Sequence, residues 1–369
     1  MIDFDVAVVG AGAAGIGVAA ALARLGVQKL VVLEREQVGA SFSRWPRETR
    51  FISPSFTTNG FGMPDLNAVT PNSSPAFAIR RSHMTGPDYA RYLRGVVDFY
   101  KLPIRSGVDV RTVVAGDAGF TLSTSDGELQ SRFVVWAAGE QAYPRRGAFT
   151  GARLCQHTSN VLSYASIETR SPIVIGGFES GIDAAIHLAR MGKGVQVVDR
   201  TAWWEIETDD PSASLSPFTS ERLAELPSPS LLKLLGNVGV VAVELAPRGY
   251  LVRLDDGRVL TTDGPPLLAN GFAGSLQMIA PLFGVDEDGR PLLSDMDESL
   301  RSPGLFLCGP QLHHRNQHFC YIYKFRQRFA VVASAIGMRL NLALENLQEY
   351  ADANMWLDDL SCCDIDCSC

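Results

Sequence analysis

Two stretches of the chain share one order of apolar and glycine-rich segments. In the first, an apolar run at residues 6–9 leads into a glycine-rich turn, an alanine-rich segment that reaches residue 23, and a second apolar run at residues 30–33. Short uninterrupted apolar runs are typical of strands buried in a parallel sheet, whereas the longer alanine-rich segment is typical of a helix. The pattern predicts a strand, a turn, a helix and a second strand.

The second stretch repeats this order with nearly equal spacing. An apolar run at residues 172–175 and a valine-rich segment at 195–198, which includes Gln196, enclose a glycine-rich turn and a helical segment at residues 182–191. Between the two stretches, residues 89–100 show the apolar spacing of a packing helix. The repeated unit predicts an α/β fold with two doubly wound, Rossmann-like nucleotide-binding domains.

The apolar positions from residue 6 to residue 23 are numerous enough to resemble a membrane span. We expect no membrane segment, because this run divides into a strand, a turn and a helix. We also expect no signal peptide, because Asp3 and Asp5 precede the run in place of a basic leader. A cytoplasmic location is therefore predicted.

Composition points to a large folded protein rather than a small module. The 369 residues are 46% hydrophobic, which supports roughly two domains with full cores. The formal net charge of −7 argues against nucleic acid as a main partner, since phosphate contacts need clustered Lys and Arg. In a cytoplasmic protein, the seven cysteines favour redox, metal-binding or simply buried roles over structural disulfides.

The first glycine-rich turn has the spacing GxGxxG between a strand and a helix. Gly10 permits the tight turn, Gly12 lets a pyrophosphate approach the backbone, and Gly15 lets helix and strand pack closely. The helix N-terminus then offers N–H groups to the phosphates. Glu34 ends the next strand about 20 residues later, where a carboxylate binds ribose hydroxyls. These positions predict a dinucleotide site.

The second turn carries one departure from that spacing. Phe178 stands in the place of the second glycine, where a side chain hinders a pyrophosphate. This domain therefore either binds a nicotinamide nucleotide on a slightly shifted loop or no longer binds one. Asp199 favours NADH by repelling a 2′-phosphate, Arg200 favours NADPH, and the choice stays open.

Four further segments resemble flavin-contacting motifs of one superfamily. They are residues 39–45 (GASFSRW), 107–110 (GVDV), 133–139 (FVVWAAG) and 304–309 (GLFLCG). With the two turns, they resemble the flavoproteins with two dinucleotide-binding domains, a superfamily that includes thioredoxin reductases, bacillithiol disulfide reductases and flavin monooxygenases. The resemblance implies FAD and a nicotinamide nucleotide, NADH or NADPH, as cofactors.

The resemblance also assigns contact residues. FAD contacts are expected from Gly10, Gly12, Ala14, Gly15, Glu34, Arg35, Ser41, Trp45, Val110, Ala138, Gly139, Gly309 and Gln311. NAD(P) contacts are expected from Gly176, Gly177, Glu179, Ser180, Gly181, Asp199 and Arg200. Pro310 replaces the Asp that bonds the ribityl chain in the family, so flavin binding there depends on other groups, such as backbone N–H groups near Gln311.

The implied organisation is an NAD(P) domain inserted into a split FAD domain, usually as a homodimer. We expect the FAD domain at residues 1–150 and 267–350, the NAD(P) domain at 151–266, and a cysteine-rich tail at 351–369. The disulfide reductases of the superfamily carry a CxxC or CxxxxC pair beside the flavin. No such pair occurs between residues 1 and 361.

The tail supplies the other candidate redox groups, Cys362, Cys363, Cys367 and Cys369. Its layout resembles the cysteine tails of mercuric reductase and of large thioredoxin reductases. Neighbouring aspartates disfavour thiolates, whereas a bound soft cation stabilises them. An electron relay, capture of a soft metal and no role all stay open, and no residue is assigned as a resident metal ligand.

A run of histidines follows the last flavin motif, where the resembling fold enters the helix that faces the flavin. A histidine there can donate a proton near neutral pH, so His313 and His314 are catalytic candidates. His314 and His318, four residues apart, would share one helix face as a metal pair. Hydrogen-bonding histidines that only line the flavin pocket are the third alternative.

These features predict an FAD-dependent NAD(P)H oxidoreductase. Its acceptor would be a small molecule, a disulfide, a thiol-related compound or a soft metal, reached directly or through the tail. Two alternatives stay open: a flavin-dependent NAD(P)H monooxygenase, and a flavoprotein scaffold whose tail binds metal. The sequence does not identify the substrate.

Overall fold

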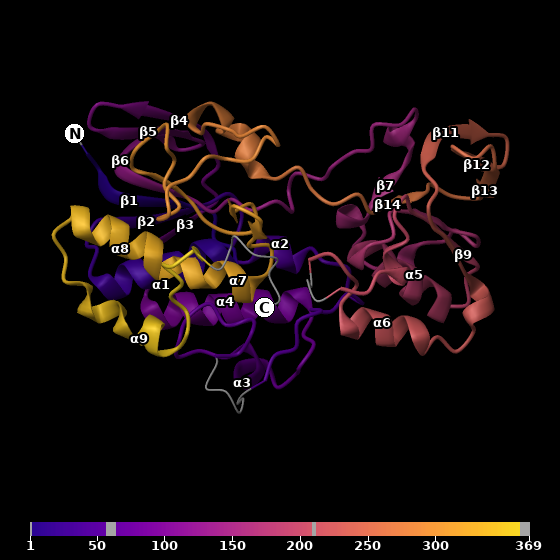
Figure 1. Ribbon diagram of the computed structural model, residues 1–369, viewed down its shortest axis with the longest axis horizontal. Helices are drawn as coiled ribbons and strands as arrows, with labels where there is room; N and C mark the ends of the chain where they lie inside the picture. The colour runs from indigo at the N-terminus through magenta and orange to yellow at the C-terminus, as the bar shows by residue number, and fades with distance from the viewer. Residues whose placement is uncertain (1, 57–63, 209–211, 362–369) are drawn as a thin grey trace. The chain divides into compact units, whose positions relative to one another are not determined.

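The chain forms two compact units, each with its own parallel sheet. The computed structural model describes residues 2–56, 64–208 and 212–361. The described residues of the first unit fall in 2–43, 54–142 and 274–361, and those of the second in 44–53 and 143–273. Figure 1 labels the elements of both units along the chain.

The first unit contains a sheet in the order β3-β2-β1-β6-β5-β4, and β15 also pairs with β6. β3, β2, β1, β6 and β15 run parallel, whereas β4 and β5 form an antiparallel extension of β6. The strands of this sheet are β1 (Phe4–Val9), β2 (Leu30–Glu34), β3 (Ile104–Ser106), β4 (Val110–Gly116), β5 (Gly119–Thr124), β6 (Gly127–Trp136) and β15 (Leu305–Leu307). A separate hairpin consists of β16 (His313–His314) and β17 (Gln317–His318).

The helices of the first unit include one that is buried on nearly all sides. α1 contains six alanines and two glycines. Its Gly17 lies so close to α8 that a Cβ there would come within 2.5 Å of the Phe329 ring. The α-helices are α1 (Ala13–Leu25), α2 (Ala40–Ser43), α3 (Pro75–Ile79), α4 (Gly86–Tyr100), α7 (Ile322–Phe325), α8 (Phe329–Arg339) and α9 (Gln348–Asp352). The 3-10 helices are η6 (Ser275–Met278), η7 (Ala280–Leu282), η8 (Arg326–Arg328) and η9 (Leu344–Leu347).

The second unit contains a fully parallel sheet in the order β10-β9-β8-β14-β7 and a three-stranded antiparallel sheet, β11-β12-β13. The strands are β7 (Gln156–His157), β8 (Ile173–Ile175), β9 (Val195–Val198), β10 (Leu232–Leu235), β11 (Val240–Ala246), β12 (Gly249–Leu254), β13 (Val259–Thr262) and β14 (Leu267–Leu268). The helices are α5 (Glu179–Arg190), α6 (Pro217–Ala224), η1 (Ala152–Leu154), η2 (Thr158–Asn160), η3 (Tyr164–Ser166), η4 (Trp203–Glu205) and η5 (Pro229–Leu231).

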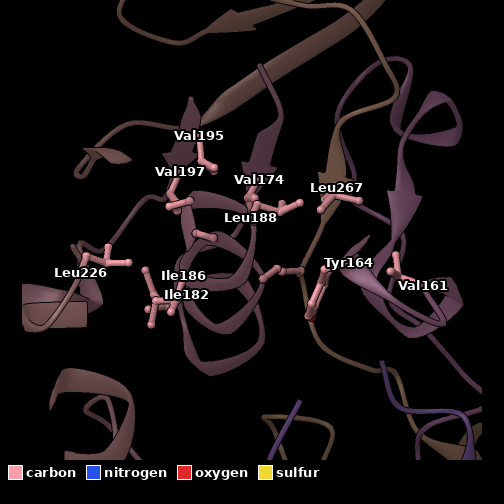
Figure 2. Close-up of a cluster of buried hydrophobic side chains, with 14 of the residues drawn as sticks. Val161, Tyr164, Val174, Ile182, Ile186, Leu188, Val195, Val197, Leu226 and Leu267 are labelled. Atoms are coloured by element: carbon pink, nitrogen blue, oxygen red, sulfur yellow. The ribbon is translucent and has the colours of Figure 1, made fainter. Parts of the chain in front are cut away.

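The core of the second unit lies between α5 and the parallel sheet. Figure 2 shows Ile182, Ile186 and Leu188 of α5 in one buried cluster with valines of β8 and β9, and all three are fully buried. Burial of one such side chain contributes about 1.5–3 kcal/mol of hydrophobic free energy. This core holds the N-terminal end of α5 beside the loop that follows β8.

Residues 44–53 belong to the second unit although the chain on either side of them belongs to the first. Glu48 accepts hydrogen bonds from the Ser163 hydroxyl at 2.5 Å and from the Tyr164 amide at 3.0 Å. Thr49 donates its hydroxyl to the buried Asp183 of α5 at 2.7 Å. These side chains fix the segment to η3 and α5, a connection that the sequence pattern does not reveal.

The strands and helices predicted for the two repeated stretches are confirmed as β1, α1 and β2 and as β8, α5 and β9. The packing helix predicted at residues 89–100 is confirmed as α4. Within the described ranges, no helix combines the length and the apolar character needed to cross a membrane.

Candidate functional site

The loop between β1 and α1 has the geometry of a phosphate cradle. Gly10 adopts a left-handed conformation with φ of 104°, and a Cβ there would lie 2.5 Å from the Ala137 carbonyl oxygen. A Cβ on Gly15 would lie 2.9 Å from the Gly10 carbonyl carbon and closer still to its oxygen. By contrast, a Cβ on Gly12 would have no atom within 4 Å. Two glycines therefore allow close backbone packing, and the third keeps space in front of the helix N-terminus.

A carboxylate is fixed beside this loop at the end of β2. Glu34 accepts hydrogen bonds from the Ala11 amide through Oε2 and from the Glu36 amide through Oε1, both at 2.8 Å. This places the acid where a ribose of a bound dinucleotide would meet it. Arg35 is partly exposed, and its Nε lies 3.8 Å from Glu36.

Two other segments of the first unit reach the same loop. Ala137, at the end of β6, donates its amide to the Val9 carbonyl at 2.9 Å, so the predicted contacts Ala138 and Gly139 follow directly beside the loop. A Cβ on Gly309, after β15, would lie 3.0 Å from the Cβ of Ala14. The structure thus gathers these predicted FAD contacts around the N-terminus of α1.

Gln311 is held next to this group by its side chain. Its Oε1 accepts hydrogen bonds from the Leu276 amide at 3.1 Å and from the Ser275 hydroxyl at 3.3 Å. Ser275 in turn accepts the indole N–H of Trp136 at 3.1 Å. The amide side chain of Gln311 therefore anchors the segment after β15 instead of pointing into open space.

Other predicted FAD contacts are not gathered in this way. Ser41 lies in α2 of the first unit, whereas Trp45 falls in the second unit, with its ring 4.9 Å from Phe51. Val110 is buried at the start of β4. The nearby Val108 donates its amide to the backbone carbonyl of Glu34 at 2.9 Å, so this segment is bonded to the end of β2.

The loop after β8 repeats the first loop closely. Gly176 has φ of 104°, a Cβ on it would lie 2.5 Å from the Ala269 carbonyl oxygen, and a Cβ on Gly181 would lie 2.9 Å from the Gly176 carbonyl carbon. Asp199 accepts hydrogen bonds from the Gly177 amide at 2.6 Å and from the Thr201 amide at 2.7 Å. The backbone and the acid therefore match those of the first unit.

The repeat extends to a segment that the sequence analysis did not single out. Ala269 donates its amide to the Ile175 carbonyl at 2.8 Å, as Ala137 does to Val9, and Gly271 has φ of 70°, close to the 66° of Gly139. Asn270 lies between Ala269 and Gly271, as Ala138 lies between Ala137 and Gly139. An apolar strand followed by AxG occurs in both units, and this shared pattern was the available signal.

The second loop differs from the first in its side chains. Phe178 caps α5 with φ of −88°, as Gly12 caps α1 with −83°, and its ring packs 5.0 Å from that of Trp203. Glu179 places a carboxylate in the first turn of α5, whereas the first turn of α1 has no acidic residue. As it stands, the second cradle does not fit a dinucleotide in the way that the first does.

The remaining polar groups of this loop are held or exposed. Glu179 accepts hydrogen bonds from the Thr219 hydroxyl at 2.6 Å and from the Ser216 amide. Burial raises the pKa of Glu179, against the opposing effect of these hydrogen bonds. Ser180 and Arg200 are both exposed, and a Cβ on Gly239 would lie 3.0 Å from Nε of Arg200.

The expectation that the histidine run enters a helix is wrong. His313 and His314 lie in β16, and His318 lies in β17 of the antiparallel hairpin. His313 and His318 pair across the hairpin with ring centroids 3.9 Å apart, whereas His314 points to a different partner. His314 and His318 therefore do not share a helix face, because alternate strand positions replace helical spacing.

The electrostatics of the hairpin bear on the proton-donor hypothesis. Burial lowers the pKa of His313 to about 4, with the neighbouring His318 adding to the effect. His313 is then neutral near pH 7, which argues against an imidazolium acid at this position. His318 is bonded to the Pro310 carbonyl at 2.7 Å, so the stacked pair lies beside the last flavin motif.

His314 belongs to a buried ion cluster. Its Nε2 lies 2.5 Å from Oδ1 of Asp297, and Arg328 binds the same carboxylate through Nε at 3.0 Å and a terminal nitrogen at 2.8 Å. Asp297 and Arg328 are fully buried, and Arg328 also bonds the Leu357 carbonyl. The cluster joins the hairpin, η8 and the C-terminal segment.

The cysteines of the described chain form no redox pair. Cys155 and Cys308 are buried in different units, and burial raises the pKa of the Cys155 thiol to about 11 and that of Cys308 well above its usual value. Cys320 is half-buried. The four predicted redox cysteines, Cys362, Cys363, Cys367 and Cys369, lie outside the described residues.

The chain belongs to the pyridine nucleotide-disulphide oxidoreductase family, whose model matches residues 7–309. This membership confirms the predicted class of enzyme, oxidoreductases that use FAD and NAD(P)H. A curated relative, ferredoxin–NADP reductase of Levilactobacillus brevis, is 28% identical over 141 residues. That match covers 37% of this chain and 43% of the relative, so it spans less than half of that protein.

Solved structures support the same fold. Bacillithiol disulfide reductase Bdr from Staphylococcus aureus superposes with a TM-score of 0.74 at 19% identity, covering 92% of this chain and 99% of that one. A flavin-containing monooxygenase from Stenotrophomonas maltophilia superposes with a TM-score of 0.71 at 17% identity, covering 92% and 100%. The predicted arrangement of two Rossmann-like domains is therefore confirmed.

Proposed function

We propose that this protein is an FAD-dependent oxidoreductase that takes electrons from NADH or NADPH and reduces a disulfide or a related sulfur compound. The observation that carries the proposal is the first cradle, which combines the open position at Gly12 with the fixed carboxylate of Glu34. Family membership supports the electron donor, and the similarity to a disulfide reductase supports the acceptor class.

The residues of the first unit fit FAD. The N-terminus of α1 lies behind Gly12, so its amides can bind a pyrophosphate without a side chain in between. Glu34 would hold the adenosine ribose, and the segments at Ala138 and Gly309 would flank the cofactor. When bound, FAD accepts a hydride and passes on two electrons.

The acceptor is inferred from which thiols can react. Thiolates, not thiols, exchange with disulfides, and the raised pKa values of Cys155 and Cys308 keep both protonated at neutral pH. A sulfur acceptor would therefore meet the flavin directly or through the tail cysteines. The overall reaction balances as NAD(P)H plus one proton and a disulfide giving NAD(P)+ and two thiols.

Anaerobic kinetics test this proposal. The full-length FAD-loaded protein is mixed with NADH or NADPH, and flavin absorbance and thiol appearance are followed with bacillithiol disulfide, glutathione disulfide or cystine present. We expect flavin reduction, then turnover with at least one disulfide at two thiols per nucleotide. A flavin that neither nucleotide reduces contradicts the donor assignment.

The tail enters the same proposal as a relay. A variant that ends at Ser361 should still reduce artificial dyes with the same nucleotide while losing turnover of the disulfide. Unchanged disulfide turnover would show that the acceptor meets the flavin directly. The predicted homodimer, cytoplasmic location and soft-metal acceptor stay predictions.

Monooxygenation is the second candidate, favoured by the similarity to a flavin-containing monooxygenase and by the absence of a dithiol among the residues described. It requires dioxygen, whereas disulfide reduction does not. Turnover of an organic substrate only in air, with one oxygen atom gained per nucleotide consumed, would support it. Disulfide turnover without air supports the first proposal.

A further inference from the structure

The second cradle contains an aromatic side chain that has no counterpart in the first. Trp204 of η4 lies so close to Gly177 that a Cβ on this glycine would be 2.5 Å from Cζ3 of the indole. The same Cβ would lie 2.9 Å from the Cβ of Asp199, and a Cβ on Gly236 would be 3.1 Å from Cζ2 of Trp204. The indole therefore lies among the loop after β8, the acid after β9 and the turn after β10.

The two units differ at this point in a matched pair of positions. In the first unit, Ala11 fills the position of Gly177, and Gly39 stands five residues after Glu34, as Trp204 stands five residues after Asp199. The Gly39 amide donates to the Ala11 carbonyl at 3.0 Å. The first unit thus has Ala11 and Gly39 at these two positions. The second unit has Gly177 and, covering it, the indole of Trp204.

The position of the indole coincides with one part of a dinucleotide site. In an open parallel sheet, ligands bind outside the carboxyl ends of the strands, with the pyrophosphate at the glycine loop and the ribose at the acid of the next strand. The carboxyl ends of β8, β9 and β10 lead into Gly176, Asp199 and Gly236. The indole of Trp204 covers this adenosine end. Phe178 takes the N-cap position that Gly12 has in the first unit, and its ring packs against Trp203 and the core.

We propose that Trp204 occupies the adenosine end of the second cradle, so that a nicotinamide nucleotide binds there only after the indole has moved. The inference rests on the proposed function, in which the second unit binds NADH or NADPH. Gly177 is the residue that allows the closed position, because alanine there would collide with the indole. The apparent affinity for nucleotide is then reduced by the fraction of molecules in which the indole has moved.

Two substitutions displace the indole by different means. Trp204→Ala removes the ring, whereas Gly177→Ala keeps it and fills the space that it occupies. Gly177 does not adopt a left-handed conformation, so alanine introduces no backbone strain there. Gly194→Ala is the matched control, because a Cβ on Gly194 would meet nothing within 4 Å and its φ is also not left-handed.

The experiment is titration calorimetry of the full-length FAD-loaded protein with NAD+ and with NADP+. We expect Trp204→Ala and Gly177→Ala each to lower the dissociation constant of at least one nucleotide by roughly tenfold, the effect of releasing a site that is about 10% open. Gly194→Ala should bind like the wild type. Circular dichroism and the FAD-to-protein ratio verify that each variant is folded.

Weaker or unchanged binding in folded Trp204→Ala would overturn the proposal, since a ring that stacks on bound adenine must weaken binding when it is removed. Opposite shifts in the two variants would overturn it as well. Anaerobic flavin reduction by NADH and NADPH tests the proposed function separately from the position of Trp204. If the variants bind nucleotide more tightly but no protein shows flavin reduction, the proposed function alone is refuted. If the wild-type flavin is reduced but Trp204→Ala binds nucleotide more weakly, only this inference is refuted.

Discussion

Replacing Gly15 by alanine tests the close contact that forms the first cradle. The new Cβ would lie 2.9 Å from the Gly10 carbonyl carbon and closer to its oxygen, and neither atom can rotate away because both belong to the backbone of the loop. Such overpacking typically costs about 1–3 kcal/mol. Alanine regains up to about 1 kcal/mol of helix propensity. We therefore expect the free energy of unfolding to fall by up to about 2 kcal/mol.

A second glycine supplies a control of opposite sign. Gly95 is exposed within α4, and a Cβ there would meet nothing within 4 Å. The same change of glycine to alanine should raise the free energy of unfolding by about 0.5–1 kcal/mol. The two helical substitutions thus differ in sign although they are chemically identical.

A third glycine separates folding from cofactor binding. Gly12 has open space at its Cβ position and a φ of −83°, so alanine should change the stability of the apoprotein by about 1 kcal/mol at most. The methyl group would enter the space in front of α1, and we expect FAD to bind at least tenfold more weakly.

Urea denaturation of the apoprotein and FAD titration by fluorescence measure both quantities for all three variants. Gly15→Ala should weaken both stability and FAD binding, Gly12→Ala mainly FAD binding, and Gly95→Ala neither. A Gly15→Ala protein that is stabilised like Gly95→Ala would refute the close approach of loop and helix. A Gly12→Ala protein with wild-type FAD affinity would refute the position assigned to the pyrophosphate.

Three further predictions follow from buried groups. Asp297→Ala leaves Arg328 buried without its carboxylate, so the free energy of unfolding, measured by urea denaturation, should fall by about 3–5 kcal/mol. Equal free energies of unfolding for wild type and variant would contradict the cluster. His313 has a pKa of about 4 in the folded protein, below its usual 6.5, so the unfolded chain binds the proton first as the pH falls. The free energy of unfolding of the first unit should therefore fall as pH drops from 6.5 towards 4. His313→Phe should flatten this dependence. Cys155 is buried with a pKa of about 11, so iodoacetamide at pH 8 should modify it at least tenfold more slowly in the folded protein than in urea; equal rates would show that the thiol is exposed.

Elements set by local pattern were predictable from the sequence. The short apolar runs became β1, β2, β8 and β9 because mostly buried apolar residues suit a strand covered on both faces. Gly10 and Gly176 were predictable because the left-handed turn that each makes is a property of its own backbone. The acids Glu34 and Asp199 were found because the turn and the next strand have a fixed spacing.

The histidine hairpin shows where local pattern was insufficient. A run with three histidines in eight residues carries no apolar period that separates a helix from a hairpin, and the resemblance favoured a helix. The structure instead pairs His313 with His318 and directs His314 to Asp297, a partner 17 residues earlier in the chain. Asp297 also binds the buried Arg328, so the hairpin is joined to segments with no local sequence relation to it.

The sequence by itself determined the family, the two strand–turn–helix–strand units and the positions of their glycines and acids, because each depends on residues within about 30 positions of one another. Only the tertiary structure decided that residues 44–53 join the second unit through Glu48 and Thr49, and that Trp204 covers Gly177. Those outcomes depend on which remote side chains fill the space beside a given backbone. Packing of this kind is settled by the shape of the whole unit and leaves no periodic signal along the chain.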